Sequence, residues 1–222
     1  MKIEYDAVSQ DLELFVKEVL EEFSSFHGRA LADAQIGIVE CPAEEDMTKR
    51  GNHAEVEKCG EKYVVRVPKI MVREREIVVP SLGHELVHVD TFYTLRKEDY
   101  NPVVYNCLQE GRSVFFEEWL KWKNQKEPSS IFEETVRERA SELRKKADGL
   151  DMMLEIVKPF VDGVSSRSIL NAYWVGLCVC LESYKEEGKA YFDKALEKGS
   201  FKQMNDCSIE ELIKKYTPYC VE

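Results

Sequence analysis

Two histidines flank a glutamate in the stretch SLGHELVHVD, residues 81–90, of a chain that has four histidines in all. His84 and His88 are four residues apart, so on a helix both imidazoles project from one face and can bind one zinc ion at about 2.0–2.1 Å. Glu85 points toward the position that such a metal keeps open. In the H-E-x-x-H pattern this glutamate takes a proton from a zinc-bound water as the water attacks a carbonyl. The stretch predicts zinc-dependent hydrolysis.

A catalytic zinc ion usually has three protein ligands, so a third ligand is required beyond the two histidines. Glu110 lies early in the next expected helix, within CLQEGRSVFFEEW. If the two helices pack side by side, its carboxylate can complete the coordination. The structural alternative is a pair of hydrogen-bonded histidines in a protein core.

The elements that must position these residues follow from apolar spacing. Steps of three and four predict an amphipathic helix over 7–26. Two short segments rich in β-branched residues, 34–41 and 62–68, predict strands, with the charged stretch 42–61 as a loop or a hairpin arm. The motif helix is expected to begin near Pro80 or Ser81, because proline suits a first helical turn and serine can cap one, and to end near Leu95.

A second long helix is expected over 103–123, with a break at 124–130. The rest reads as helix, over 130–148, 149–160, 167–187, 189–198 and 208–216. The expected fold class is α+β, predominantly α. A catalytic subdomain over 1–124 would contain the small sheet, and a helical subdomain would follow over 125–222.

Composition narrows the class of protein. Apolar residues make up 44% and charged residues 33%, as in globular proteins. The net charge of -11, without a basic patch, argues against nucleic-acid binding. We expect a cytoplasmic protein that neither spans a membrane nor carries a secretion signal, because no suitable apolar run is present. The seven cysteines suit reduced thiols. Cys41, His53 and Cys59 are weighed as a second metal site, although their spacing matches no standard finger.

HELVH, followed by EGRSVFFEE, resembles the gluzincin metallopeptidases, including their peptidase MA-like members. The order of elements over 7–123 is similar to that of the compact minigluzincins. This resemblance implies a zincin-like fold in which the first helix is a backing helix and 62–68 is the substrate-binding edge strand. It also implies that His84, His88 and Glu110 bind zinc and that Glu85 is the base.

Departures from related families refine that expectation. Thr94 stands where metzincins have a third histidine, and nothing matches the G-x-M-x-N strand of aminopeptidases, so an endopeptidase or oligopeptidase is favoured. Thermolysin-like members carry an acid where Val114 stands, which leaves Ser113 or Glu117 to support the ligands.

NAYWVGLCVCLESYKEEG is similar to a Y-x-x-G helix of peptidase MA-like proteins, which makes Tyr173 the candidate oxyanion donor. Arg167 is a second candidate. The alternative for Tyr173 is an amphipathic aromatic residue with its hydroxyl at the surface.

The function implied is a zinc metallopeptidase that acts on a peptide or protein substrate. Two alternatives stay open. One is a zinc-bearing scaffold without catalysis whose helical half binds a partner. The other is a latent enzyme covered by its own last segment, with Cys220 as a possible inhibitory ligand. The sequence leaves the substrate, the oligomeric state and the metal loaded in the cell undetermined.

Overall fold

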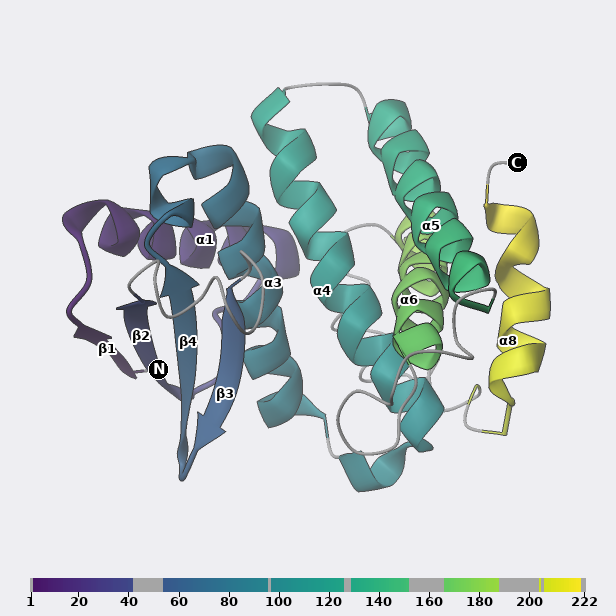
Figure 1. Cartoon of the computed structure of the whole chain (residues 1–222), viewed down its shortest axis with the longest axis horizontal. Coiled ribbons are helices and arrows are strands. Elements are labelled where there is room, and N and C mark those ends of the chain that lie inside the picture. The colour runs from purple at the N-terminus through teal and green to yellow at the C-terminus, as the bar shows by residue number, and fades with distance from the viewer. Residues whose placement is uncertain are drawn as a thin grey trace. The chain divides into compact units, whose positions relative to one another are not determined.

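The computed structural model of the protein (Figure 1) describes residues 2–41, 54–95, 97–125, 129–151, 166–187, 204 and 206–220. Helices predominate among them, and four strands form one small mixed sheet. The expected class, α+β and mainly α, is confirmed. The chain divides into two compact units: Met1–Arg96 with Trp119–Gln125, and Lys97–Glu118 with Lys126–Glu222.

The sheet of the first unit has the order β1-β2-β4-β3. Its strands are β1 (Lys2–Asp6), β2 (Gln35–Cys41), β3 (Glu55–Cys59) and β4 (Lys62–Pro68). The ladders β1–β2 and β2–β4 are parallel, and β3 is antiparallel to β4. The two predicted strands are confirmed as β2 and β4, and β1 was not predicted.

The prediction that 62–68 is an edge strand is wrong, because β4 lies between β2 and β3. The outer strands among the described residues are β1 and β3, and β3 forms a tight hairpin with β4 across Gly60. Gly60 has a φ of 66°, in the region that glycine enters without steric cost. This turn brings the charged segment 55–59 into the sheet as the hairpin arm that the sequence left open.

Helix α1 (Gln10–His27) confirms the first expected helix to within a few residues. The Ser9 side chain accepts a hydrogen bond from the Leu12 amide, and Gly28 ends the helix in the left-handed region at φ 68°. One apolar face of α1 is fully buried, through Leu12, Val16, Val19, Phe23 and Phe26.

Helix α3 (Arg75–Thr94) follows the 3-10 turn η1 (Met71–Arg73) and packs against α1, β3 and β4. It begins earlier than the predicted start near Pro80, which lies inside it. A proline there costs one backbone hydrogen bond. Val78 and Val79 have no exposed surface, and their burial draws the preceding turn into the helix.

The second unit is helical. It contains η2 (Lys97–Asp99), α5 (Ser129–Asp151), α6 (Ser166–Glu187), α8 (Ile209–Tyr216) and η5 (Thr217–Tyr219). It also contains most of α4 (Pro102–Gln125), whose residues 119–125 belong to the first unit. The helices expected over 103–123, 167–187 and 208–216 are confirmed. The boundary expected at 148–149 is wrong, since α5 is continuous there, and 152–160 and 189–198 lie outside the described residues.

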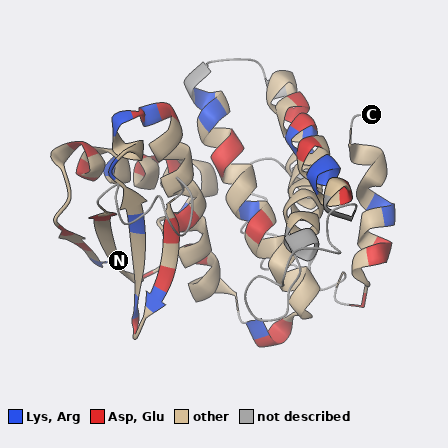
Figure 2. Ribbon diagram, in the orientation of Figure 1, with Lys and Arg blue, Asp and Glu red and all other residues tan. Residues whose placement is uncertain are grey.

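Acidic and basic residues are interspersed along α5 (Figure 2), where Arg139 pairs with Glu142 and Arg144 with Asp148. Such a pattern is typical of a solvated helix face. None of the described helices is long and apolar enough to cross a membrane.

The backbones of α4 and α6 touch at two glycines. A Cβ atom built on Gly176 would lie 1.9 Å from the Cys107 carbonyl oxygen, and one built on Gly111 would lie 2.3 Å from the Gly176 carbonyl carbon. Both obstacles are backbone atoms, which cannot move aside without displacing a helix. Glycine at these two positions therefore sets how closely α4 and α6 pack.

Gly176→Ala is expected to destabilise the protein by at least about 2 kcal/mol, because the added methyl group forces α4 and α6 apart. The matched control is Gly149→Ala in α5, where an added Cβ meets nothing within 4 Å. That change is expected to leave stability equal or raise it by up to about 1 kcal/mol, because alanine has the higher helix propensity. Urea unfolding followed by circular dichroism measures both. Equal effects of the two substitutions would contradict the close contact.

Candidate metal centre

The motif residues lie in the middle of α3, where the helix is buried on most sides. His84 is half-buried, while Glu85 and His88 expose only 9% and 6% of their surface. His88 lies four residues after His84 and three after Glu85, so the three side chains share one side of the helix. The arrangement expected from their spacing is thus present.

The two imidazoles turn the same nitrogen toward each other. Nε2 of His84 and Nε2 of His88 are 3.0 Å apart, with the rings edge to face. Two ligand atoms bound at 2.0–2.1 Å to one tetrahedral ion are about 3.3 Å apart. The histidine pair is therefore close to the geometry that one metal ion requires of it.

Aromatic contacts from the sheet hold the ring of His88. Phe92, one turn later on α3, stacks on His88 with ring centroids 6.3 Å apart. Tyr63 of β4 stacks on Phe92 at 5.2 Å, and its ring also meets that of Tyr93. Tyr63, near the start of β4, therefore restricts the orientation of the His88 ring through Phe92.

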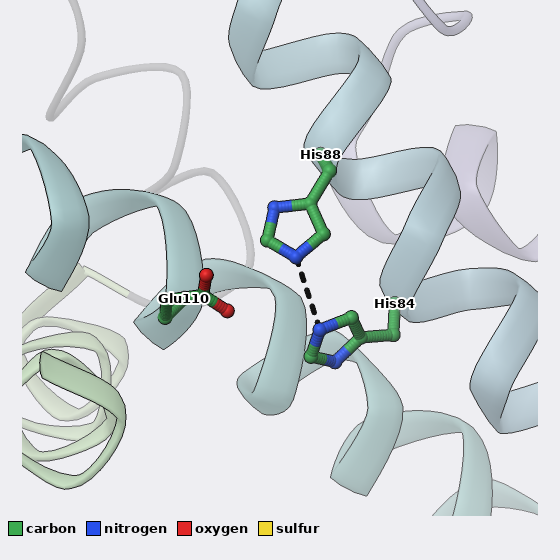
Figure 3. Close-up of side chains that lie close together, drawn as sticks. All are labelled: His84, His88 and Glu110. Carbon is green, nitrogen blue, oxygen red and sulfur yellow. Dashed lines mark hydrogen bonds between the residues drawn. The ribbon is translucent and has the colours of Figure 1, made fainter. Parts of the chain in front are cut away.

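Glu110 of α4 completes a group that can hold a metal ion. One ligand atom each from His84, His88 and Glu110 lies within 4.8 Å of the others. Figure 3 labels these three side chains and shows the two rings leaving the same side of α3. Two imidazole nitrogens and one carboxylate oxygen are a donor set that catalytic zinc sites use. The structure brings together all three residues that the sequence analysis selected as ligands.

A buried ion pair fixes α3 within the first unit. Asp90 has no exposed surface, and Arg29 donates to both of its oxygens, Nη1 to Oδ1 at 2.9 Å and Nη2 to Oδ2 at 2.8 Å. The Ala32 amide also donates to Oδ1, at 3.1 Å. Three hydrogen bonds thus compensate the buried charge. The contact joins the motif helix to the connection between α1 and β2.

Sequence reasoning missed this pair, although Asp90 stands in the first stretch considered. The available signal was an acid within the apolar run LVHVDT, since a charge buried there must have a partner. The partner, Arg29, directly follows the glycine that ends α1, and nothing in the local pattern identifies it.

Edge strand β3 runs alongside the motif helix. The Ala54 amide at its start donates to Ser81 Oγ at 3.4 Å, and the Tyr93 hydroxyl donates to the Glu61 carbonyl oxygen, also at 3.4 Å, just beyond its end. The histidines lie between Ser81 and Tyr93 along α3. Strand β3, an outer strand of the sheet among the described residues, is therefore next to the helix that carries them.

Tyr173 is a half-buried residue of α6. It lies three residues before Gly176, so it is on the side of α6 that meets α4 at Gly111, the residue after Glu110. This position is compatible with the role of oxyanion donor predicted for Tyr173. The role itself stays a prediction. The side chain of Arg167, the second candidate, lies outside the described residues.

The remaining expectations have mixed outcomes. Ser113 is fully buried and Glu117 half-buried on α4, and their support of the ligands stays a prediction. The structure contradicts the second metal site that was weighed for Cys41, His53 and Cys59. Cys41 pairs with Pro68 and Cys59 with Lys62, at opposite ends of β4 and so about 20 Å apart. His53 lies outside the described residues.

Comparison with known proteins adds no assignment: no protein-family model matches the chain, and a search of curated proteins finds no significant match.

Arg29→Met is expected to destabilise the protein by about 3 kcal/mol, because it leaves the Asp90 carboxylate buried without its charged partner. Urea unfolding measures the loss. Adding Asp90→Asn to this variant removes the buried charge and keeps an acceptor for the Ala32 amide, so part of the loss should be recovered. A single variant as stable as the wild type would show that the pair does not hold α3.

Proposed function

We propose that the protein is a zinc-dependent metallopeptidase of the gluzincin type, with His84, His88 and Glu110 as zinc ligands and Glu85 as general base. The proximity of the three ligand atoms carries this proposal, because residues selected from sequence for one reaction lie within 4.8 Å of one another. The neighbouring position of Glu85 adds the group that the reaction needs beside the metal.

The donor set favours zinc. Two imidazoles and one carboxylate suit a borderline metal better than calcium or magnesium, which prefer oxygen ligands. The group has three members among the described residues, and catalytic zinc sites have three protein ligands, whereas structural sites have four. When bound, zinc would supply Lewis acidity that polarises a peptide carbonyl and lowers the pKa of a water.

Glu85 performs the proton transfers in this proposal. Its carboxylate accepts a proton from the attacking water and then gives it to the nitrogen of the leaving amine. Burial supports this role, since a carboxylate removed from bulk water interacts more strongly with a nearby charge and with the proton it transfers.

The free edge of β3 is the proposed place for an extended substrate, which would add to the sheet through main-chain hydrogen bonds. The sequence analysis had expected the substrate to bind along 62–68. That segment is β4, which lies inside the sheet, so β3 takes its place in the proposal. Tyr173 is the proposed donor to the oxyanion that forms during attack.

A zinc-bearing scaffold is the second candidate, and a latent enzyme the third. The scaffold is less well supported, because a structural site has no use for a glutamate base beside three ligands. For the latent form, Cys220 interacts with Cys178 of α6 and with Arg144 and Ser141 of α5. None of these is a proposed zinc ligand, so these interactions give no support to Cys220 as an inhibitory ligand.

Zinc binding tests the ligand set. Zinc affinity should fall by more than about 100-fold in each of His84→Ala, His88→Ala and Glu110→Ala. Loss of a residue that only hydrogen-bonds to a ligand usually lowers metal affinity by about 10- to 100-fold, so a larger loss identifies a ligand. Titration against a chromophoric chelator measures this, with metal content checked by mass spectrometry. Gln109→Ala, the neighbouring residue on α4, is the control and should bind as the wild type does. Tight, stoichiometric zinc in Glu110→Ala would remove Glu110 from the ligand set.

Peptide cleavage tests the function. Zinc-loaded wild type should produce new termini in a diverse peptide mixture, read by mass spectrometry. Glu85→Gln should lose at least about 100-fold of that rate while keeping its zinc, because it removes only the base. Tyr173→Phe should lose about 100-fold in kcat with zinc affinity unchanged. If wild type and Glu85→Gln both bind zinc and neither cleaves, the scaffold or latent form is favoured instead.

A further inference from the structure

Segment 209–220 is held against α6 by one carboxylate. Glu182 accepts a hydrogen bond from the Tyr216 hydroxyl at 3.0 Å and another from the Tyr219 hydroxyl at 2.6 Å. Lys215 adds an ion pair with the same residue at 3.9 Å. Leu212 and Tyr216 are buried beneath these contacts. The segment therefore has a defined seat on α6.

Cys220 directly follows Tyr219 and extends this set of contacts along α6. Cys178 lies on α6 one turn before Glu182, so the hydrogen bond from Tyr219 to Glu182 brings Cys220 close to Cys178, and each thiol shifts the pKa of the other. Arg144 and Ser141 of α5 also act on the pKa of Cys220, and Ser141 is itself buried. Two sulfur atoms and one guanidinium group thus meet where α5, α6 and segment 209–220 converge.

The surroundings shift the pKa values of the two thiols in opposite directions, which makes one the nucleophile and the other its partner. The hydrogen bond from Cys178, and then the charge and hydrogen bond of Arg144, hold the pKa of Cys220 below its usual range despite partial burial. For Cys178, the hydrogen bond to Cys220, burial and nearby Cys180 raise the pKa, and Arg137 only partly offsets them. Cys220 is therefore the thiolate of the pair, and Cys178 keeps its proton.

The other buried cysteines of α4 and α6 lack this activation. Burial raises the pKa of Cys107 and of Cys180 to about 12, so both stay protonated and unreactive. Cys41 is the competitor to consider, because Arg66 hydrogen-bonds to it. Its position at the end of β2 places it in the other unit from Cys178 and Cys220.

We propose that Cys220 and Cys178 form a peroxide-responsive site that closes a reversible disulfide between segment 209–220 and α6. In the first step the Cys220 thiolate attacks a peroxide oxygen. An S–O bond forms, the O–O bond breaks, and the sulfur is oxidised to sulfenic acid as hydroxide leaves.

In the second step the Cys178 sulfur attacks the Cys220 sulfur. An S–S bond forms, the S–O bond breaks, and the departing hydroxide takes the thiol proton and leaves as water. Two thiols and one hydrogen peroxide thus give one disulfide and two waters. A dithiol reductant reverses the change by thiol–disulfide exchange.

Closure requires the two sulfur atoms to approach to about 2.05 Å. The Tyr219–Glu182 hydrogen bond already holds the residue before Cys220 at a position one turn from Cys178 on α6. The bond would convert a hydrogen-bonded seat into a covalent one. This site involves neither His84, His88 nor Glu110, so it stands or falls independently of the proposed peptidase activity.

The test uses the full chain, reduced, desalted and treated with a small excess of hydrogen peroxide, both with and without zinc. Intact mass should fall by two hydrogen atoms, and non-reducing peptide mapping should join the peptides of Cys178 and Cys220. A disulfide between other cysteines, or first oxidation at exposed Cys59 or at Cys41, would overturn the proposal. The wild-type map decides this without any variant.

Variants assign the order of events. Cys178→Ala should accumulate Cys220 sulfenic acid that dimedone traps, because the second thiol is missing. Cys220→Ser should slow peroxide consumption by at least about tenfold, and Arg144→Gln should slow it several-fold by withdrawing the charge that favours the thiolate. Cys59→Ser is the control and should match the wild type. Equal rates for Cys220→Ser and the wild type would show that Cys220 is not the nucleophile.

Discussion

Burial of ionisable groups on α3 is the constraint on which the first unit depends. The helix packs against α1, β3 and β4, yet it carries His84, Glu85, His88 and Asp90. A carboxylate with no exposed surface is tolerated only when hydrogen bonds replace its water. Arg29 and the Ala32 amide supply these bonds to Asp90, which ties α3 to the connection after α1. The motif histidines lie on a helix whose position is set by a charge pair and by apolar packing together.

In the second unit, α6 is buried along most of its described length, and its sides serve different contacts. Gly176 meets the α4 backbone, which fixes the packing of the helix that carries Glu110. Cys178 and Glu182 receive segment 209–220. Residues two apart on a helix point about 200° from each other. Gly176 and Cys178 therefore serve different neighbours, and one helix fixes the packing of α4 and seats the last described segment.

Sequence reasoning succeeded where the signal was local and periodic. The apolar spacing of α1, α4 and α6 is a property of neighbouring residues. It failed where the deciding partner was remote. The edge position of β3 depends on β4 pairing with β2 across a parallel ladder, and the start of α3 depends on burial of Val78 and Val79 against other elements. The histidine pair was local, whereas Glu110 could be selected only by assuming that its helix packs beside the motif helix.

The two candidate sites use donor atoms of opposite susceptibility to oxidation. The metal group consists of imidazole nitrogens and a carboxylate oxygen, which peroxide does not attack under conditions that oxidise a thiolate. The seat of segment 209–220 instead depends in part on sulfur, with Arg144 favouring the reactive form of Cys220. A zinc site built on thiolates would lose its metal when oxidised, because ligand and reactive group would be the same atom. Here nitrogen and oxygen ligands separate the two chemistries, so an oxidant can change how segment 209–220 is attached to α6 while the proposed ligands keep their ability to bind metal.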